Sequence, residues 1–401
     1  MFQEKEFYSK LCVAGSIKFG VDKATREDKN LSGNARFSCN LATILARDSE
    51  NVAVNLKILS NKYKVYIAKD SAWLGEDLEY INKVKGILTN VSKDAPMSLE
   101  KAHERNDVKD LVTAVMKYCS NKIEYRLDKL KKYIADDEEK IYIKSFLNYA
   151  KTKIDVDDTF KKKLAMSKVC FEYYQISKKD STISKKFLRH IKKVGSYFGS
   201  LMDITDCVRK ERYKASFSCI DIHLLDPITT NQLIYSWNDI IKRFIPIPEE
   251  YEYFKKVCLE DCEIKKRLEN VYDSIDTQMN CENSIHICLH AELNVLTNIM
   301  DQGKEKKFIA VSKRCCYLCE SYIRFLRSKG YKITVSGTNQ KLYHGWKLPD
   351  AFKKEFMSDT LFNLDLIIES KIEYHTNIID KSDSDYDYDT SIIDWIDNFE
   401  V

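Results

Sequence analysis

The sequence predicts an α/β fold that is interrupted by a long, mainly helical insertion. A pattern typical of a β-hairpin occupies residues 51–68, and a strand–helix–strand pattern occupies residues 307–336. Strands and helices that alternate through short connections are typical of a sheet covered by helices. Most of the chain between these two patterns instead has apolar residues at spacings of three and four, which indicates helices.

The N-terminal part of the fold is predicted to hold one helix and one hairpin. Residues 35–48 have their apolar side chains on a single helical face, and residues 51–59 and 63–68 alternate apolar and polar side chains. Alternation with a period of two is typical of half-buried strands, and a short polar link between two such runs indicates a hairpin. We assign residues 1–72 to this part of the fold.

Residues 73–282 are the predicted insertion. Apolar spacing predicts helices at 73–88, 98–120, 123–154, 159–177, 183–202, 231–244 and 249–275. Residues 213–225 are an exception, because their apolar side chains alternate in the way that an extended segment requires. The segment is expected to end at Asp226-Pro227, since the residue before a proline disfavours helix.

The core of the predicted fold resumes at residues 283–378. Its elements are expected in the order helix 292–301, strand 307–312, helix 316–328 and strand 331–336. Residues 364–368 either add a last strand or continue a helix. Residues 379–401 form an acidic, low-complexity tail that is predicted to be disordered.

Composition narrows the class of protein. A chain of 401 residues with 44% hydrophobic content can bury a core, and only 11 glycines and 5 prolines suggest long helices. Thirteen irregularly spaced cysteines do not form a disulfide framework, which favours a reducing compartment. The first residues lack the basic and apolar regions of a signal peptide, and no run reaches the length of a membrane span. We therefore expect a cytoplasmic protein with no membrane partner, and export without a leader stays open.

Two short motifs carry the chemistry. His290 and Glu292 lie two residues apart, and Cys316 and Cys319 lie three residues apart after a strand-like run. One imidazole and two thiolates make the three-ligand set that leaves a position on zinc open for water. Glu292 is not needed as a ligand, and beside a metal its carboxylate can move protons.

The spacing of the first motif restricts where its helix begins. Residues two apart in the middle of a helix point about 200° apart, so His290 and Glu292 cannot share a helical face there. They converge only if the helix starts near His290. The polar, helix-poor residues 278–284 and the apolar repeat that starts at Leu293 favour such a start.

Two nearby residues compete as ligands. Cys315 and Cys319 are four apart and can also reach one ion. His286 and His290 are four apart as well, and with two cysteines they would complete a closed structural zinc site. The alternative function is then a non-catalytic, zinc-stabilised helical interaction protein.

A basic region lies within the insertion. Its cations are Lys185, Lys186, Arg189, Lys192, Lys193, Arg209, Lys210, Arg212 and Lys214, with Tyr197, Phe198 and Tyr213 between them. Interleaved cations and aromatic residues can hold the backbone of RNA or DNA. A solvated helix face explains the same pattern.

With the motifs placed on strands and helices, residues 283–350 resemble the cytidine-deaminase-like superfamily. The resemblance rests on His290-Ala291-Glu292, on residues 311–314 leading into Cys316-x-x-Cys319, and on Tyr343-His344-Gly345-Trp346. More narrowly, the chain looks like the nucleic acid and nucleotide deaminase-like family of fungi and rickettsial bacteria. Residues 35–70 share the resemblance weakly.

The resemblance implies a three-layer α-β-α sheet and hydrolytic removal of an amino group from a cytosine- or adenine-type base, in a nucleic acid or a nucleotide. His290, Cys316 and Cys319 would bind Zn²⁺, and Glu292 would be the catalytic proton shuttle. Many members of this superfamily have proline where Cys315 stands. Because this chain has a cysteine there, Cys315 competes with Cys316 as the first cysteine ligand. Trp346 is then either a base-pocket residue, together with His344, or part of the core.

Overall fold

The computed structural model describes residues 2–21, 31, 33–48, 50–59, 62–154, 159–272, 279, 281–301 and 305–376. The chain divides into two compact units. Unit 1 consists of Met1–Glu27, Pro227–Lys307 and Arg314–Val401, and unit 2 consists of Asp28–Asp226 and Phe308–Lys313. The predicted α/β class with a large helical part is confirmed.

The sheet of unit 2 is built on the predicted hairpin. Strand β1 (Val52–Leu59) pairs antiparallel with β2 (Lys62–Lys69), in a register that places Val52 opposite Lys69. Strand β3 (Ile220–Leu225) runs parallel to β2, and residues 309–311 of β6 (Lys307–Val311) pair antiparallel with β1. The turn residues 60 and 61 lie outside the described residues. The strand order in this unit is therefore β3-β2-β1-β6.

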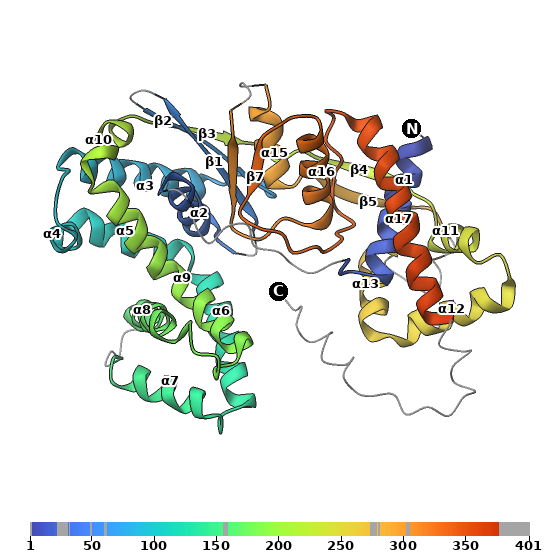
Figure 1. Cartoon of the computed structure of the whole chain (residues 1–401), viewed down its shortest axis with the longest axis horizontal. Coiled ribbons are helices and arrows are strands. Elements are labelled where there is room, and N and C mark those ends of the chain that lie inside the picture. Colours follow the sequence, from blue (N-terminus) through green and yellow to red (C-terminus); the bar gives the residue numbers. More distant parts are fainter. Residues whose placement is uncertain are drawn as a thin grey trace. The chain divides into compact units, whose positions relative to one another are not determined.

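Helices make up most of unit 2 (Figure 1). They are α2 (Gly33–Leu45), α3 (Gly75–Lys93), α4 (Leu99–Glu104), α5 (Asn106–Tyr118), α6 (Ser120–Asp136), α7 (Ile141–Lys151), α8 (Thr159–Ser177), α9 (Lys185–Val208) and α10 (Glu211–Ser218). Buried apolar residues of α2, α3 and the hairpin form one core cluster that continues into α5, α6, α8 and α9. Helical periodicity thus predicts the location of most of this unit correctly.

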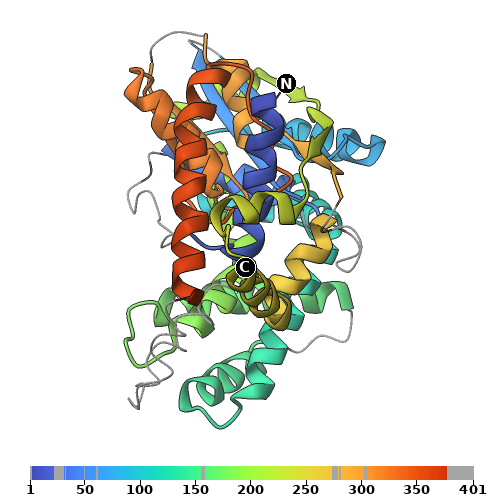
Figure 2. The same cartoon turned by 90° about the vertical axis from the view of Figure 1, so that its right-hand side faces the viewer.

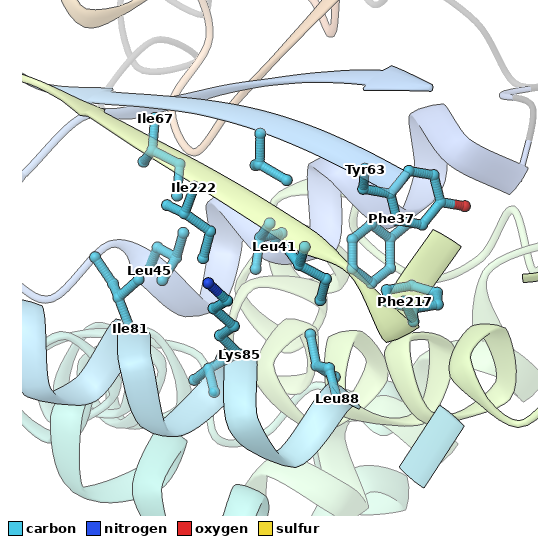
Figure 3. A pocket seen from close by; sticks show the side chains of 13 residues that line it. Phe37, Leu41, Leu45, Tyr63, Ile67, Ile81, Lys85, Leu88, Phe217 and Ile222 are labelled. Carbon is cyan, nitrogen blue, oxygen red and sulfur yellow. The ribbon is translucent and has the colours of Figure 1, made fainter. Parts of the chain in front are cut away.

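A small apolar cavity lies where α2 and α3 meet the sheet (Figure 3). Its volume is about 20 Å³, which is close to the space that one water molecule needs. Phe37, Leu41 and Ile222 are among the side chains that line it, and Lys85 is the charged member of the lining. The cavity belongs to the packing between helices and sheet.

Unit 1 contains the remaining elements. They are α1 (Phe2–Ile17), β4 (Thr229–Ile234), α11 (Trp237–Phe244), α12 (Pro248–Glu260), α13 (Cys262–Tyr272), β5 (Asn283–Cys288), α15 (Ala291–Ile299), α16 (Tyr317–Ser328), β7 (Ile333–Val335) and α17 (Lys353–Thr376). Strands β4 and β5 pair antiparallel. Helix α1 is buried over residues 7–17 and packs against α17, as Figure 2 shows. The option of a strand at 364–368 is excluded, because these residues lie within α17.

Two predicted helices are each interrupted. The helix predicted at 98–120 breaks at Arg105, whose backbone is extended and whose guanidinium pairs with Asp107 at 2.7 Å. The helix predicted at 123–154 breaks between α6 and α7, across a run of acids at residues 136–139. Acidic residues are favoured just before a helix N-terminus, which is the position they take before α7.

Two further predictions are wrong in part. Residues 231–234 belong to strand β4 instead of the helix predicted at 231–244, and only α11 is helical there. Residues 213–218 belong to helix α10 instead of the predicted extended segment. In β4 the pairing with β5 determines the structure, and a periodicity within one segment does not report a partner 50 residues away.

The acidic tail predicted at 379–401 lies outside the described residues, and the predicted segment boundaries at 72, 282 and 378 stay predictions. Within the part of the chain that the structure describes, none of the helices combines the length and the apolar character needed to cross a bilayer.

Candidate metal centre

The first motif sits at the start of a helix. His290 is the N-cap of α15, with φ −57° and ψ 145°, and it follows strand β5 after one residue. Because an N-cap residue lies outside the helical turn, the 200° separation expected in mid-helix does not apply to His290 and Glu292. The predicted helix start near His290 is confirmed.

The second motif is also at a helix start. Cys316 is the N-cap of α16, and its Sγ accepts a hydrogen bond from the backbone N–H of Cys319 at 3.4 Å. The residue before it is fixed by backbone hydrogen bonds, since Cys315 N–H donates to Gly337 O at 2.9 Å and Asn339 N–H donates to Cys315 O at 2.7 Å. Gly337 has φ 131°, a conformation that residues with a side chain rarely adopt.

The structure brings the three predicted ligands together. Cys316 Sγ lies 3.6 Å and Cys319 Sγ 3.4 Å from His290 Nδ1. The ligand atoms of all three residues lie within 4.8 Å of one another, and both cysteines are buried. Among the described residues, these three make up the group of His, Cys, Asp or Glu side chains whose ligand atoms lie close enough together to hold a metal ion. Three donors of this type leave one tetrahedral position of zinc open.

Electrostatics favour a thiolate at Cys316. Burial alone would raise its pKa, but a hydrogen bond from Cys319 and the neighbouring His290 side chain lower the pKa of Cys316 to about 6. Burial raises the pKa of Cys319 well above its usual range. One thiolate and one thiol beside an imidazole form a donor set that fits zinc, because a bound cation favours loss of the second proton.

Glu292 and Cys315 form a separate pair beside this group. Glu292 is only 1% exposed, and the Cys315 thiol is hydrogen-bonded to its carboxyl group. Burial, followed by the charge of Glu292, raises the pKa of Cys315 well above its usual range. Cys315 is not a member of the metal-ligand group. The structure therefore separates the two neighbouring cysteines, with Cys316 facing His290 and Cys315 bonded to Glu292.

The other competing residue, His286, lies on strand β5. Its side chain is exposed, and its Nδ1 is 3.2 Å from Asn231 Oδ1 on the paired strand β4. It is not part of the group that contains His290. The closed Cys2His2 arrangement is therefore not formed.

Aromatic residues after β7 complete the surroundings of the thiols. Trp346 is fully buried, and its indole N–H donates to Cys319 Sγ at 3.2 Å. The segment is held to β5 because Cys288 N–H donates to Gly345 O at 2.8 Å and Lys347 N–H donates to Cys288 O at 2.9 Å. Trp346 is thus part of the core, which is one of the two alternatives predicted from sequence, and it also donates a hydrogen bond to a predicted ligand.

Sequence reasoning missed Tyr343 as a residue of the site. Its ring centroid is 6.1 Å from that of His290, and its side chain is 36% exposed. Phe19, which follows helix α1, lies edge-on to it at 5.4 Å. The signal was present in the Tyr343-His344-Gly345-Trp346 motif, but residue type alone does not say which of its aromatic side chains faces the ligands. His344 is partly buried, and burial lowers its pKa.

Comparison with protein families gives one match at this centre. Residues 289–350 match the model of a family described as an OTT_1508-like deaminase. The matched range contains all three members of the metal-ligand group as well as Glu292 and Trp346. The predicted resemblance to a deaminase family is confirmed over this range. No curated protein and no solved structure matches the chain.

Proposed function

We propose that this protein is a zinc-dependent deaminase that hydrolytically removes an amino group from a cytosine- or adenine-type base, in a nucleic acid or a nucleotide. The observation that carries the proposal is the convergence of His290, Cys316 and Cys319 beside the buried Glu292. The match to a deaminase family over residues 289–350 supports it.

Each residue has a role that follows from its position. His290 and the two cysteines would hold Zn²⁺, which when bound supplies a Lewis acid that lowers the pKa of water. Glu292 would take a proton from the attacking water and deliver it to the ring nitrogen and then to the departing amine, which leaves as ammonia. Its burial keeps this proton away from bulk solvent, and Cys315 orients the carboxyl group through their hydrogen bond.

Around these residues, Trp346 would fix Cys319, and Tyr343 would offer an aromatic face at the exposed side of His290. Flipped bases are commonly held against aromatic side chains. The proposal includes a reducing compartment such as the cytoplasm, because a ligand thiolate must stay reduced.

Glu292→Gln tests the catalytic part of the proposal. The variant should retain one zinc per chain and lose ammonia release by about 10²-fold or more, since proton transfer contributes at least that much. Zinc would be measured by atomic emission, and turnover by ammonia release from cytidine and adenosine nucleotides and from oligonucleotides that contain these bases.

His290→Ala is the matched variant, and it should lose both zinc and activity. If the wild-type protein binds zinc but releases no ammonia, and its expression leaves no C-to-U or A-to-I changes in the nucleic acids of the host, the non-catalytic zinc protein is the better description. Unchanged turnover in Glu292→Gln would remove Glu292 from the mechanism.

A further inference from the structure

The structure separates the predicted basic region into cations that bond to other residues of unit 2 and cations that line up on one face of a helix. Arg209 and Lys210 both pair with Asp206, and Lys214 Nζ donates to Ala95 O at 2.8 Å. These three cations therefore have partners within unit 2. Arg212, on α10, lies 4.7 Å from the ring centroid of Tyr213. The other five cations lie on α9, where Lys186, Arg189 and Lys193 recur at spacings of three and four and so share one helical face.

Helix α6 extends this basic face. Arg126 Nη1 donates to Lys193 O at 2.9 Å, so α6 packs against α9 through a cation. Lys129 is one turn further along α6, on the same face as Arg126. In Figure 1 the two helices lie side by side, in agreement with their contacts.

The charges of these helices act on one another. The pKa of His190 on α9 falls to about 4, first because of burial and then because of Lys193, Lys186 and Lys129. The pKa of Lys313 is lowered by burial and, among the cations, by Arg126, although Asp70 and Glu50 offset part of this effect. Ser312 N–H donates to Val52 O at 2.9 Å and Lys122 Nζ of α6 donates to Glu50 O at 3.3 Å, so the segment after β6 and helix α6 meet at residues 50–52. Cations from α9, α6 and the segment after β6 are therefore near neighbours. Lys313 precedes Cys316 by three residues in the chain.

Two acids of α6 pair with lysines outside this row. Asp128 pairs with Lys131 at 2.9 Å, and Glu124 pairs with Lys163 at 2.9 Å. Glu50 bonds to the buried Lys69 at 2.8 Å. These three carboxylates thus pair with lysines outside the row, and Asp70 is the acid that acts most strongly on Lys313.

An exposed aromatic side chain lies within the row. Tyr125 on α6 is 55% exposed, and Lys129 Nζ lies 4.6 Å from its ring centroid. Tyr125 also lies close enough to Lys313 to affect its pKa. Tyr197, one of the aromatic residues that sequence analysis placed among the cations, is fully buried and cannot meet a ligand.

We propose that this cationic row, defined as Lys313, Arg126, Lys129, Lys186, Arg189 and Lys193, binds the phosphate backbone of a single-stranded nucleic acid, with Tyr125 stacking on a base. Cations that follow a backbone beside an exposed aromatic ring are the usual means of binding single strands. A duplex would not present an unstacked base to Tyr125. This proposal concerns a binding surface on unit 2 that is separate from the proposed deaminase residues. Binding to it can therefore be measured without turnover.

Fluorescence anisotropy with labelled single-stranded DNA and RNA of about 15 nucleotides tests the row. The full chain carrying Lys129→Gln, Lys186→Gln and Lys313→Gln should bind at least about tenfold more weakly. Its slope of log affinity against log salt should be smaller by about 2, because each lost phosphate contact removes ~0.7. The control combines Lys93→Gln, Lys109→Gln and Lys117→Gln, which remove equal charge from exposed positions of the same unit.

Tyr125→Ala separates stacking from charge. It should weaken binding roughly tenfold and leave the salt slope unchanged, because a stacked base contributes no counterion release. Tyr374→Ala is its control, since Tyr374 is also 55% exposed and has Lys371 Nζ 4.8 Å from its ring centroid. Circular dichroism spectra that match the wild type would show that the substitutions leave the fold intact.

Equal losses in the row variant and its control would overturn the proposal in favour of net charge alone. Absence of oligonucleotide binding at low salt would also overturn it. So would row-dependent binding to anionic vesicles without oligonucleotide binding, because the partner would then be a membrane surface. Glu292→Gln should bind like the wild type, so a failed deaminase assay leaves this test intact.

Discussion

The hydrogen bond between Cys315 and Glu292 gives a role to a residue that the motif alone leaves ambiguous. Cys315 stands directly before Cys316, and its spacing to Cys319 also allowed it as a ligand. In the fold, its backbone is fixed by Gly337 and Asn339, and its thiol faces the carboxyl group of Glu292. Of the two roles that the spacing allowed for Cys315, metal ligand or partner of Glu292, the fold therefore favours the partner of Glu292.

Trp346→Phe should weaken zinc binding while it preserves the fold. Phenylalanine keeps an aromatic ring in the core but removes the N–H that donates to Cys319 Sγ at 3.2 Å. Loss of such a supporting bond typically costs about 10- to 100-fold in metal affinity. Competition with a chromophoric chelator would measure the change.

Trp237→Phe is the matched control for this experiment. Trp237 is also fully buried in unit 1, and its indole nitrogen has no hydrogen-bond partner within the described structure. Its replacement should leave zinc affinity unchanged. Equal losses in the two variants would mean that ring packing, and not the bond to Cys319, supports the centre.

Helix packing explains two glycines of α9. A Cβ on Gly195 would lie 2.5 Å from the backbone nitrogen of Phe171 and 2.7 Å from its Cα, both on helix α8. A Cβ on Gly199 would meet the ring of Phe171 at 2.8 Å. Glycine is therefore required at Gly195, because the obstructing atoms belong to the backbone and cannot rotate away.

Gly195→Ala should destabilise the protein by about 1–3 kcal/mol, the usual cost of excess volume in a packed interior. Gly86→Ala, in the middle of α3, should instead stabilise it by roughly 0.5–1 kcal/mol, because a Cβ there meets nothing within 4 Å and alanine favours helix. Urea unfolding of both variants would measure the difference. Similar effects of the two substitutions would contradict close packing of α8 and α9.

Elements whose signal lies within their own residues were predicted well. The hairpin, α2, α15 and α16 follow from local periodicity and from capping residues. The centre itself was predictable because each half of it is a short motif at a helix start. Elements that depend on distant partners were not predictable in this way. Strand β4 takes its structure from pairing with β5, and the buried helix α1 has no clear apolar stripe, because nearly all of its faces are covered.

The division into two units was not accessible from sequence either. Unit 2 joins residues 28–226 to a segment only six residues long, Phe308–Lys313, which enters its sheet beside β1. Apolar spacing shows that residues 309–311 form a strand, but it does not show which strand lies next to them. The chain passes from unit 2 back into unit 1 at Arg314, two residues before Cys316.

The stability of the whole molecule should rise with pH between about 7 and 10 because of Lys122. Burial, with help from Arg126 and Lys313, lowers the pKa of Lys122 to about 7, whereas an unfolded lysine titrates near 10.4. Between these values the unfolded chain binds one proton more than the folded chain, so the free energy of unfolding increases with pH, by up to about 1.4 kcal/mol per pH unit.

Lys122→Met should remove this increase and raise the stability at pH 7 or below, because the variant no longer buries a charge. Urea unfolding of wild type and variant at several pH values would measure it. A pH dependence shared by both proteins would assign the effect to another group.

The proposed ligands at the two helix starts would also affect the stability of the fold, because a metal bound by both would crosslink distant parts of the chain. His290 and Cys316 are 26 residues apart, and an ion bound by both would close the chain between them into a loop. A crosslink that closes a loop of this length restricts the unfolded chain by roughly 3–4 kcal/mol on entropic grounds. Zinc would therefore crosslink the N-termini of α15 and α16, and the ion would contribute to the folding of unit 1 as well as to its chemistry.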